Sequence, residues 1–194
     1  MPAVAIEGAK GVGRTATASR RAAETFTVDR TVTRRNVATD PELILNGRSP
    51  TFVDEWQRVP DVWDVLCHAV DHSPEPGRFL LASPAYPPVE ARLHPGAGRI
   101  VRAFMRPLSM PERGIDAPSI SFADLMAGAR PALAGRTDVG VHDYVGEIFD
   151  SGFPGIRAAP RPAHRSLLDS YLDRIVDTHV PEEAGRVHRP AALR

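Results

Sequence analysis

Lysine and cysteine are almost absent from this sequence of 194 residues, which contains one of each, Lys10 and Cys67. A single cysteine excludes an internal disulfide framework and any zinc site built from several thiolates. Apolar runs are also short, and none approaches the roughly 20 residues that a membrane-spanning helix needs. The N-terminus lacks the basic and apolar segments of a secretory leader. We therefore expect a cytoplasmic protein with no membrane partner.

The sequence also lacks an excess of charge of either sign, with 24 basic and 24 acidic residues. Because a balanced chain has no global field that would attract nucleic acid, a nucleic-acid partner is not expected. Hydrophobic residues make up 42% of the chain and charged residues 25%, close to the averages of soluble globular proteins. We therefore expect the chain to fold around a hydrophobic core.

Five short apolar runs alternate with helical patterns in the first part of the chain. The helical patterns cover residues 16–24 and 60–72. The apolar runs, which we predict to be strands, are residues 3–6, 26–29, 51–53, 78–83 and 99–105. Strands that are apolar throughout and separated by helices are typical of a parallel sheet covered on both faces. The predicted fold class is therefore α/β, a parallel sheet flanked by helices.

The pattern changes after Pro107. Helical periodicity there covers residues 122–126, 141–149 and 166–180, and glycine and proline separate these segments. We therefore predict one domain over residues 1–110 and a helical extension over residues 111–194. We expect the extension to be the start of a longer C-terminal domain.

A glycine-rich stretch, GAKGVGRT, follows the first predicted strand and opens the first predicted helix. It matches the phosphate-loop pattern G-x-x-x-x-G-K-[ST], except that arginine replaces the lysine. Glycines let backbone N–H groups turn toward phosphates, and the final hydroxyl ligates Mg²⁺. The alternative is an ordinary turn between strand and helix. The predicted phosphate-binding residues are Gly8, Ala9, Lys10, Gly11, Val12, Gly13, Arg14 and Thr15.

Two adjacent carboxylates, Asp54 and Glu55, follow the third predicted strand. Strand ends of a parallel sheet face the ligand crevice, so both side chains should lie near the phosphate loop. Phosphoryl transfer needs a carboxylate that holds magnesium and a group that polarises the attacking water. We assign Asp54 and Thr15 to the metal and Glu55 to the water. A solvated acidic turn is the alternative.

Further motifs accompany the loop along nearly the whole chain. In order they are IEG, VDEWQ with VP, FLL, His94 with GAGR, MRPLS, GFPG and YLDR. Together they resemble a family of bacterial and archaeal ATP-binding proteins that join an AAA-type P-loop domain to a C-terminal domain of unknown function. The resemblance implies a P-loop NTPase-like fold, binding of ATP with Mg²⁺ and a cytoplasmic location. AAA-type domains also often assemble into homo-oligomers.

The chain departs from that family at positions that matter for chemistry. Arg14 replaces the loop lysine, and Ala82-Ser83-Pro84 replaces a Thr-Gly-Ser sequence after the fourth strand. The guanidinium keeps the charge but is wider and planar, unlike a compact ammonium group. We therefore expect nucleotide binding with weak or lost hydrolysis. The alternatives are a non-enzymatic scaffold that acts through protein or DNA contacts, and a fragment of a longer gene product.

Two other groups of residues have simpler explanations. His68 and His72 lie four apart, a spacing that can bind metal, but they fall on the polar side of a predicted helix. Arg99 matches the arginine of the family's GAGR sequence and could stabilise charge near a γ-phosphate. Its alternative is an ordinary surface ion pair at the start of a strand.

Overall fold

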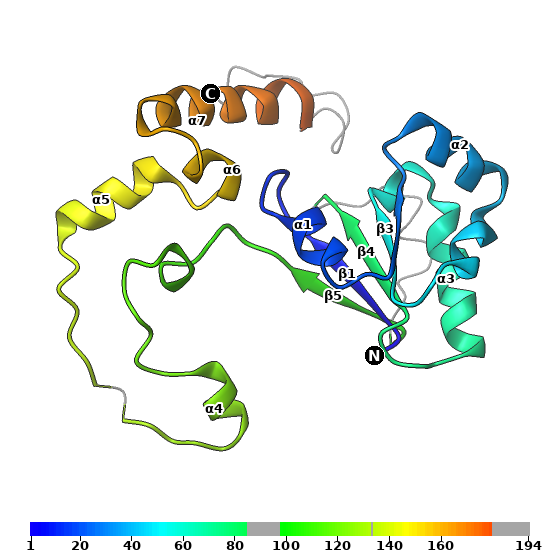
Figure 1. The fold of residues 1–194 in the computed structure, drawn as a ribbon, viewed down its shortest axis with the longest axis horizontal. Coiled ribbons are helices and arrows are strands. Elements are labelled where there is room, and N and C mark those ends of the chain that lie inside the picture. Colours follow the sequence, from blue (N-terminus) through cyan, green and yellow to red (C-terminus); the bar gives the residue numbers. More distant parts are fainter. Residues whose placement is uncertain (85–97, 133, 180–194) are drawn as a thin grey trace. The chain divides into compact units, whose positions relative to one another are not determined.

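The computed structural model of the chain describes residues 1–84, 98–132 and 134–179. It divides into two compact units (Figure 1). One comprises Met1–Arg106 together with the segment that begins at Asp173, and the other comprises Pro107–Leu172. The predicted domain boundary at residue 110 stays a prediction, because a division into compact units does not test whether each part folds independently.

The first unit is built on a five-stranded sheet in which every neighbouring pair of strands is parallel (Figure 1). The strand order is β2-β3-β4-β1-β5. The strands are β1 (Ala3–Glu7), β2 (Glu24–Thr27), β3 (Thr51–Asp54), β4 (Phe79–Ser83) and β5 (Ile100–Phe104). The predicted α/β class is confirmed, and the architecture is that of a P-loop NTPase-like parallel sheet with a short helical extension.

Helices cover the two faces of this sheet. They are α1 (Arg14–Ser19), α2 (Thr31–Thr39) and α3 (Asp61–His72), with 3-10 turns η1 (Pro41–Asn46) and η2 (Trp56–Arg58). Phe52 and Ala82 pack with Ala18 of α1, whereas Val53 and Leu81 join the larger core on the other side. The side chains of neighbouring residues in one strand therefore point to opposite faces of the sheet, as strand geometry requires.

Helix α3 supplies much of the larger core. Its buried side chains are Val62, Trp63, Leu66, Cys67 and Val70. Trp63 stacks on Trp56 of η2 with ring centroids 4.9 Å apart. The helix predicted over residues 60–72 is thus confirmed, and its apolar stripe fixes the segment that follows Asp54 against the sheet.

Local boundaries differ from the sequence prediction near α1. The predicted helix over residues 16–24 ends at Ser19, and Glu24 begins β2, two residues before the predicted strand. Pairing of Glu24 with Thr51 and of Thr27 with Asp54 recruits this segment into the sheet. Tertiary pairing thus overrides the helical propensity of the Ala- and Arg-rich stretch. Helix α2 has no counterpart among the predicted ranges.

The second unit contains four helices within its described residues. They are α4 (Phe122–Met126), α5 (Val141–Asp150), α6 (Pro154–Arg157) and most of α7 (His164–Arg174). The last two residues of α7 and the π-helical turn Ile175–His179 belong to the segment that is grouped with the first unit. The predicted helices over 122–126 and 141–149 are confirmed. The third, predicted over 166–180, begins two residues earlier, and residue 180 lies outside the described residues, as does His94 of the family motifs.

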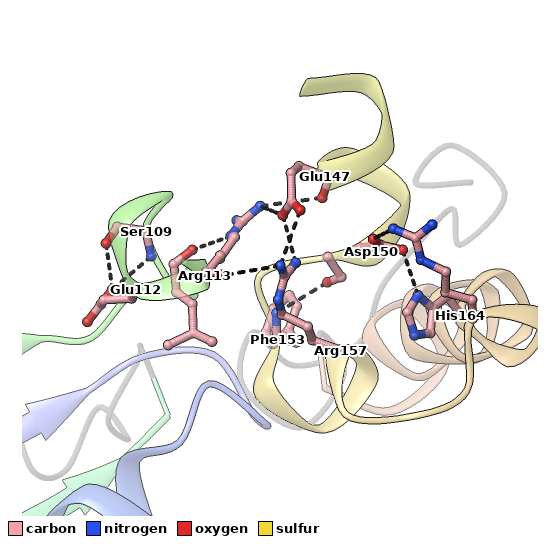
Figure 2. Close-up of polar contacts among 11 residues, drawn as sticks. Ser109, Glu112, Arg113, Glu147, Asp150, Phe153, Arg157 and His164 are labelled. Atoms are coloured by element: carbon pink, nitrogen blue, oxygen red, sulfur yellow. Dashed lines mark hydrogen bonds and ion pairs between the residues drawn. The ribbon is translucent and has the colours of Figure 1, made fainter. Parts of the chain in front are cut away.

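Polar contacts connect α5 with α6 and α7 (Figure 2). Glu147 of α5 lies between the guanidinium groups of Arg113 and Arg157, with nitrogen–oxygen distances of 3.5 and 2.6 Å. One turn later, Asp150 accepts from Arg161 at 2.6 Å and lies 3.1 Å from Nδ1 of His164. The polar face of α5 is therefore the face attached to the rest of this unit.

No helix within the described residues is long and apolar enough to cross a membrane. This agrees with the short apolar runs of the sequence.

Candidate phosphate and metal site

Three strands of the first unit end in buried polar residues at the same edge of the sheet. Glu7 ends β1, Asp54 ends β3 and Ser83 ends β4. The register places Glu7 beside Ser83 and Asp54 beside Ala82, so the three ends are adjacent. Carboxyl ends of parallel strands form the crevice in which α/β proteins bind ligands. The end of β3, which carries Asp54, therefore lies at the same edge of the sheet as the end of β1, from which the glycine-rich loop begins.

The glycine-rich loop leaves β1 at this edge and turns directly into α1. Gly11 and Gly13 have φ angles of +80° and +107°, a left-handed region that glycine adopts without steric cost. A side chain at Gly8 would collide with the backbone carbonyl oxygen of Met105. The side chain of Val12 is 1% exposed, so it anchors the loop by burial. The backbone N–H of Val12 donates to the carbonyl oxygen of Ala9 at 3.3 Å. The glycines are therefore required by the shape of the loop.

Thr15 and Asp54 lie in contact, although 39 positions separate them. The Thr15 hydroxyl donates to Oδ2 of Asp54 at 2.9 Å. Asp54 is 6% exposed, and within the described residues its other oxygen, Oδ1, has no hydrogen-bond partner. A buried carboxylate oxygen without a partner carries a desolvation cost that a bound cation would remove. The two predicted metal ligands are thus adjacent.

Burial raises the pKa of the Asp54 carboxyl, and the negative charges of Glu55 and Asp29 raise it further. The hydrogen bond from Thr15 and the positive charge of Arg14 oppose this shift but do not cancel it. The site therefore disfavours the ionised form of the Asp54 carboxyl when no cation is present. A divalent cation would favour that ionised form.

Arg14, the residue that replaces the loop lysine, is 6% exposed. Its Nη2 lies 3.3 Å from Oε1 of Glu55, in an ion pair between the loop and the residue after β3. Nη1 has no hydrogen-bond partner within the described residues. The predicted general base and the predicted phosphate-binding cation therefore bind each other. Lys10 lies half-buried in the loop.

Three further residues belong to this site and were missed from the sequence. Gln57 donates from Nε2 to Oε2 of Glu55 at 2.7 Å. Ser83 is 1% exposed, and its hydroxyl has no hydrogen-bond partner among the described residues. Asp29, after β2, is close enough to act on Asp54. Their positions at the end of β4 and shortly after the ends of β2 and β3 were the available signal, since these strand ends lie at the same edge.

The remaining sequence candidates lie elsewhere. Arg99 donates from Nε to Oδ1 of exposed Asp71 at 2.5 Å, which is the surface ion pair expected as its alternative. Nδ1 of His72 contacts the backbone oxygen of His68 at 2.8 Å. Among the described residues, no group of three or more His, Cys, Asp or Glu side chains is placed to hold a metal.

A cavity of about 630 Å³ lies in the second unit and is lined mainly by polar residues. Asp116, Asp138, Asp143 and Glu147 line it, together with Arg161. Glu147 is paired with Arg113 and Arg157, but the three aspartates still outnumber the guanidinium of Arg161, and this excess of negative charge disfavours phosphate. The cavity is therefore a poorer candidate for a nucleotide than the edge of the sheet.

The residues at the sheet edge fit a magnesium nucleotide in their chemistry. Mg²⁺ prefers oxygen ligands and is usually held by one or two carboxylates together with substrate phosphates and water. Asp54 and Thr15 supply a carboxylate and a hydroxyl of this kind. Comparison of the sequence with protein-family models and with curated proteins found no match. The functional assignment therefore depends on the geometry of this site.

Proposed function

We propose that this protein binds ATP together with Mg²⁺ at the edge formed by β1, β3 and the loop of residues 8–15. One observation carries the proposal, namely the contact of Thr15 with Asp54 beside a glycine-rich loop that leaves β1. A hydroxyl and a carboxylate 39 positions apart meet where a P-loop protein needs its metal ligands. Hydrolysis is weak or absent.

Three of the five buried polar atoms without partners among the described residues support the same proposal. Nη1 of Arg14, Oδ1 of Asp54 and Oγ of Ser83 all lack hydrogen-bond partners within the described residues. Native structures leave few such atoms, and each unsatisfied group costs about 1–3 kcal/mol. One donor cation, one anionic oxygen and one hydroxyl are the groups that a phosphate and its metal would satisfy together.

The residues have separate roles in this proposal. The loop backbone would hold the phosphates, and Asp54 and Thr15 would hold the metal. Magnesium, when bound, neutralises charge on the phosphate oxygens. Glu55 is the candidate base for an attacking water, and its ion pair with Arg14 at 3.3 Å supports the proposal that hydrolysis is weak. We further expect a cytoplasmic location and self-association of the AAA-like unit.

The thermal midpoint with and without excess MgATP tests the proposal. A ligand present at 100 times its Kd stabilises the native state by about 2.7 kcal/mol. We expect a clear rise for the natural sequence, a smaller rise with EDTA added, and a much smaller rise for Asp54→Asn or Thr15→Val.

Asp64→Asn is the matched control, because this exposed carboxylate of α3 faces away from the core. Its midpoint should rise with MgATP as much as that of the natural sequence. An unchanged midpoint of the natural sequence at millimolar MgATP would contradict ATP binding. It would favour the alternative, a P-loop scaffold without its ligand.

A further inference from the structure

The ion pair between Arg14 and Glu55 joins the two residues on which turnover at the proposed site depends. Its atoms are 3.3 Å apart, and the exposed fractions of the two side chains are 6% and 16%. While this pair is closed, the guanidinium is directed at a carboxylate of the same chain. The inference that follows rests on the proposed function, since it concerns how the same site is regulated.

Both oxygens of the Glu55 carboxylate are occupied. Arg14 takes Oε1, and Gln57 donates to Oε2 at 2.7 Å. The backbone of Glu55 is also fixed, because its φ of 56° is left-handed and its carbonyl accepts from Arg58 N at 3.1 Å. A non-glycine residue holds such a conformation only when its surroundings impose it. Glu55 is therefore held in place by both its side chain and its main chain.

The identity of residue 14 makes this arrangement possible. A guanidinium is a planar group whose several donors match a carboxylate, whereas an ammonium group is a compact charge on a flexible stem. Nη2 of Arg14 is used by Glu55, and Nη1 is buried with no partner among the described residues. The same side chain thus has one donor committed to Glu55 and another that is available to an anion.

We propose that Arg14 and Glu55 form a latch, in which the guanidinium restrains the carboxylate that would activate water and the carboxylate restrains the cation that would bind phosphate. The closed latch lowers both the affinity for nucleotide and the rate of turnover. Arg14 and Gln57 act as positioning residues for Glu55. Opening the latch from the Glu55 side frees Arg14 for phosphate, and opening it from the Arg14 side frees Glu55 for water.

The first test measures binding of a fluorescent ATP analogue with Mg²⁺ to the full chain. Glu55→Gln removes the negative partner with little change in shape, so Arg14 becomes available and the Kd should fall on the order of tenfold, since a freed charge-assisted hydrogen bond contributes that much. Glu42→Gln removes an exposed carboxylate that follows α2 and is the matched control. Its Kd should equal that of the natural sequence.

The second test measures phosphate release as a function of ATP concentration. Arg14→Lys should raise kcat on the order of tenfold, because Glu55 is released toward water. Gln57→Ala frees only Oε2 and should raise kcat by about threefold with KM unchanged, a split that general loss of structure would not produce. Arg21→Lys, at an exposed position just after α1, is the control and should change neither constant.

The outcomes separate the latch from the proposed function. Tighter binding by Glu55→Gln together with faster turnover by Arg14→Lys supports the latch. If the natural sequence binds the analogue and Glu55→Gln has the Kd of Glu42→Gln, the latch is overturned and ATP binding stands. If neither the natural sequence nor any variant binds the analogue, both are overturned.

Discussion

The sheet unit and the helical unit are stabilised by different means. Strands β1, β3 and β4 bury apolar side chains on both faces, and residues such as Phe52 and Leu81 are fully buried. Helix α5 of the other unit has its apolar residues exposed, with Ile148 at 72%, and is attached through the carboxylates of Glu147 and Asp150. The sheet therefore depends on apolar burial, whereas α5 is attached to its unit by ion pairs.

This difference bears on where a ligand site can be built. A catalytic or binding site needs side chains held by packing to within a fraction of an ångström. Asp54 belongs to a strand of which all four residues are buried, and the side chain of Val12 in the loop is buried too. The helical unit offers an open, acidic cavity and exposed apolar residues instead. A rigid phosphate site is expected in the sheet unit.

The largest effect should come from Leu81→Ala. Leu81 is fully buried in β4, so the free energy of unfolding should fall by about 3 kcal/mol through lost burial and an unfilled cavity. Ile148→Ala in α5 is the matched substitution, and its effect should stay within about 0.5 kcal/mol because the side chain is exposed. Urea unfolding measures both. Equal losses of unfolding free energy would show that the apolar residues of α5 are covered in solution.

The next largest effect should come from Glu147→Gln. This change leaves Arg113 and Arg157 without their shared anion, and the partial exposure of both guanidinium groups limits the loss to about 2 kcal/mol. Hydrogen exchange should show faster exchange in α5 and α6 with no change in β1 and β4. Faster exchange throughout both units would contradict their separate stabilisation.

A smaller, pH-dependent effect is expected at Asp150. Burial acts to raise the pKa of this carboxyl, but the hydrogen bonds from Arg161 and His164 outweigh burial and hold the pKa below its ordinary value. A carboxyl with a lowered folded pKa stabilises the fold above its unfolded pKa of about 3.9, and this contribution is lost as the pH falls through the folded value. The protection factors of the α5 amides, which correct for the slower intrinsic exchange at acid pH, should therefore fall below pH 4.

The variant Asp150→Asn is the control for that pH dependence. Its α5 amides should have lower protection factors at neutral pH, and the further fall of these factors below pH 4 should be smaller than in the natural sequence. An unchanged acid response would assign the effect to another carboxyl.

The smallest effect should come from Asp169→Asn. Asp169 and Arg165 are 4.0 Å apart on α7, and their side chains are 68% and 86% exposed. Exposed pairs of this kind contribute at most about 0.5 kcal/mol, so the urea midpoint should hardly change. A loss as large as that of Glu147→Gln would show that exposure does not decide the strength of ion pairs in this unit.

Much of the sheet could be predicted from the sequence, because the strands at its centre, β3 and β4, are largely buried and appear as apolar runs. Helix α2 was not assigned a range, since residues 31–39 contain β-branched threonines and valines with little apolar periodicity. The end of α1 was placed too late because the pairing of Glu24 with Thr51 cannot be read from local propensity. Long-range pairing decided this boundary.

Several residues of the candidate site could be predicted from the sequence, but the contact between Arg14 and Glu55 could not. The glycines, Thr15 and Asp54 follow from a motif and from the end of a strand, and the structure brings them together. The pairing of Arg14 with Glu55 spans 41 positions, and no spacing rule predicts it. Ser83 was also missed, because the burial of a hydroxyl depends on the strands beside it.

Hydrogen exchange of the full chain with and without MgATP tests the central claim most directly, since it reports on both units in one experiment. We expect slower exchange over residues 8–15 and 51–57, where the loop meets Asp54 and Glu55. Exchange around the acidic cavity of the helical unit should not change. No protection in the loop, or protection confined to the helical unit, would contradict nucleotide binding at the edge of the sheet.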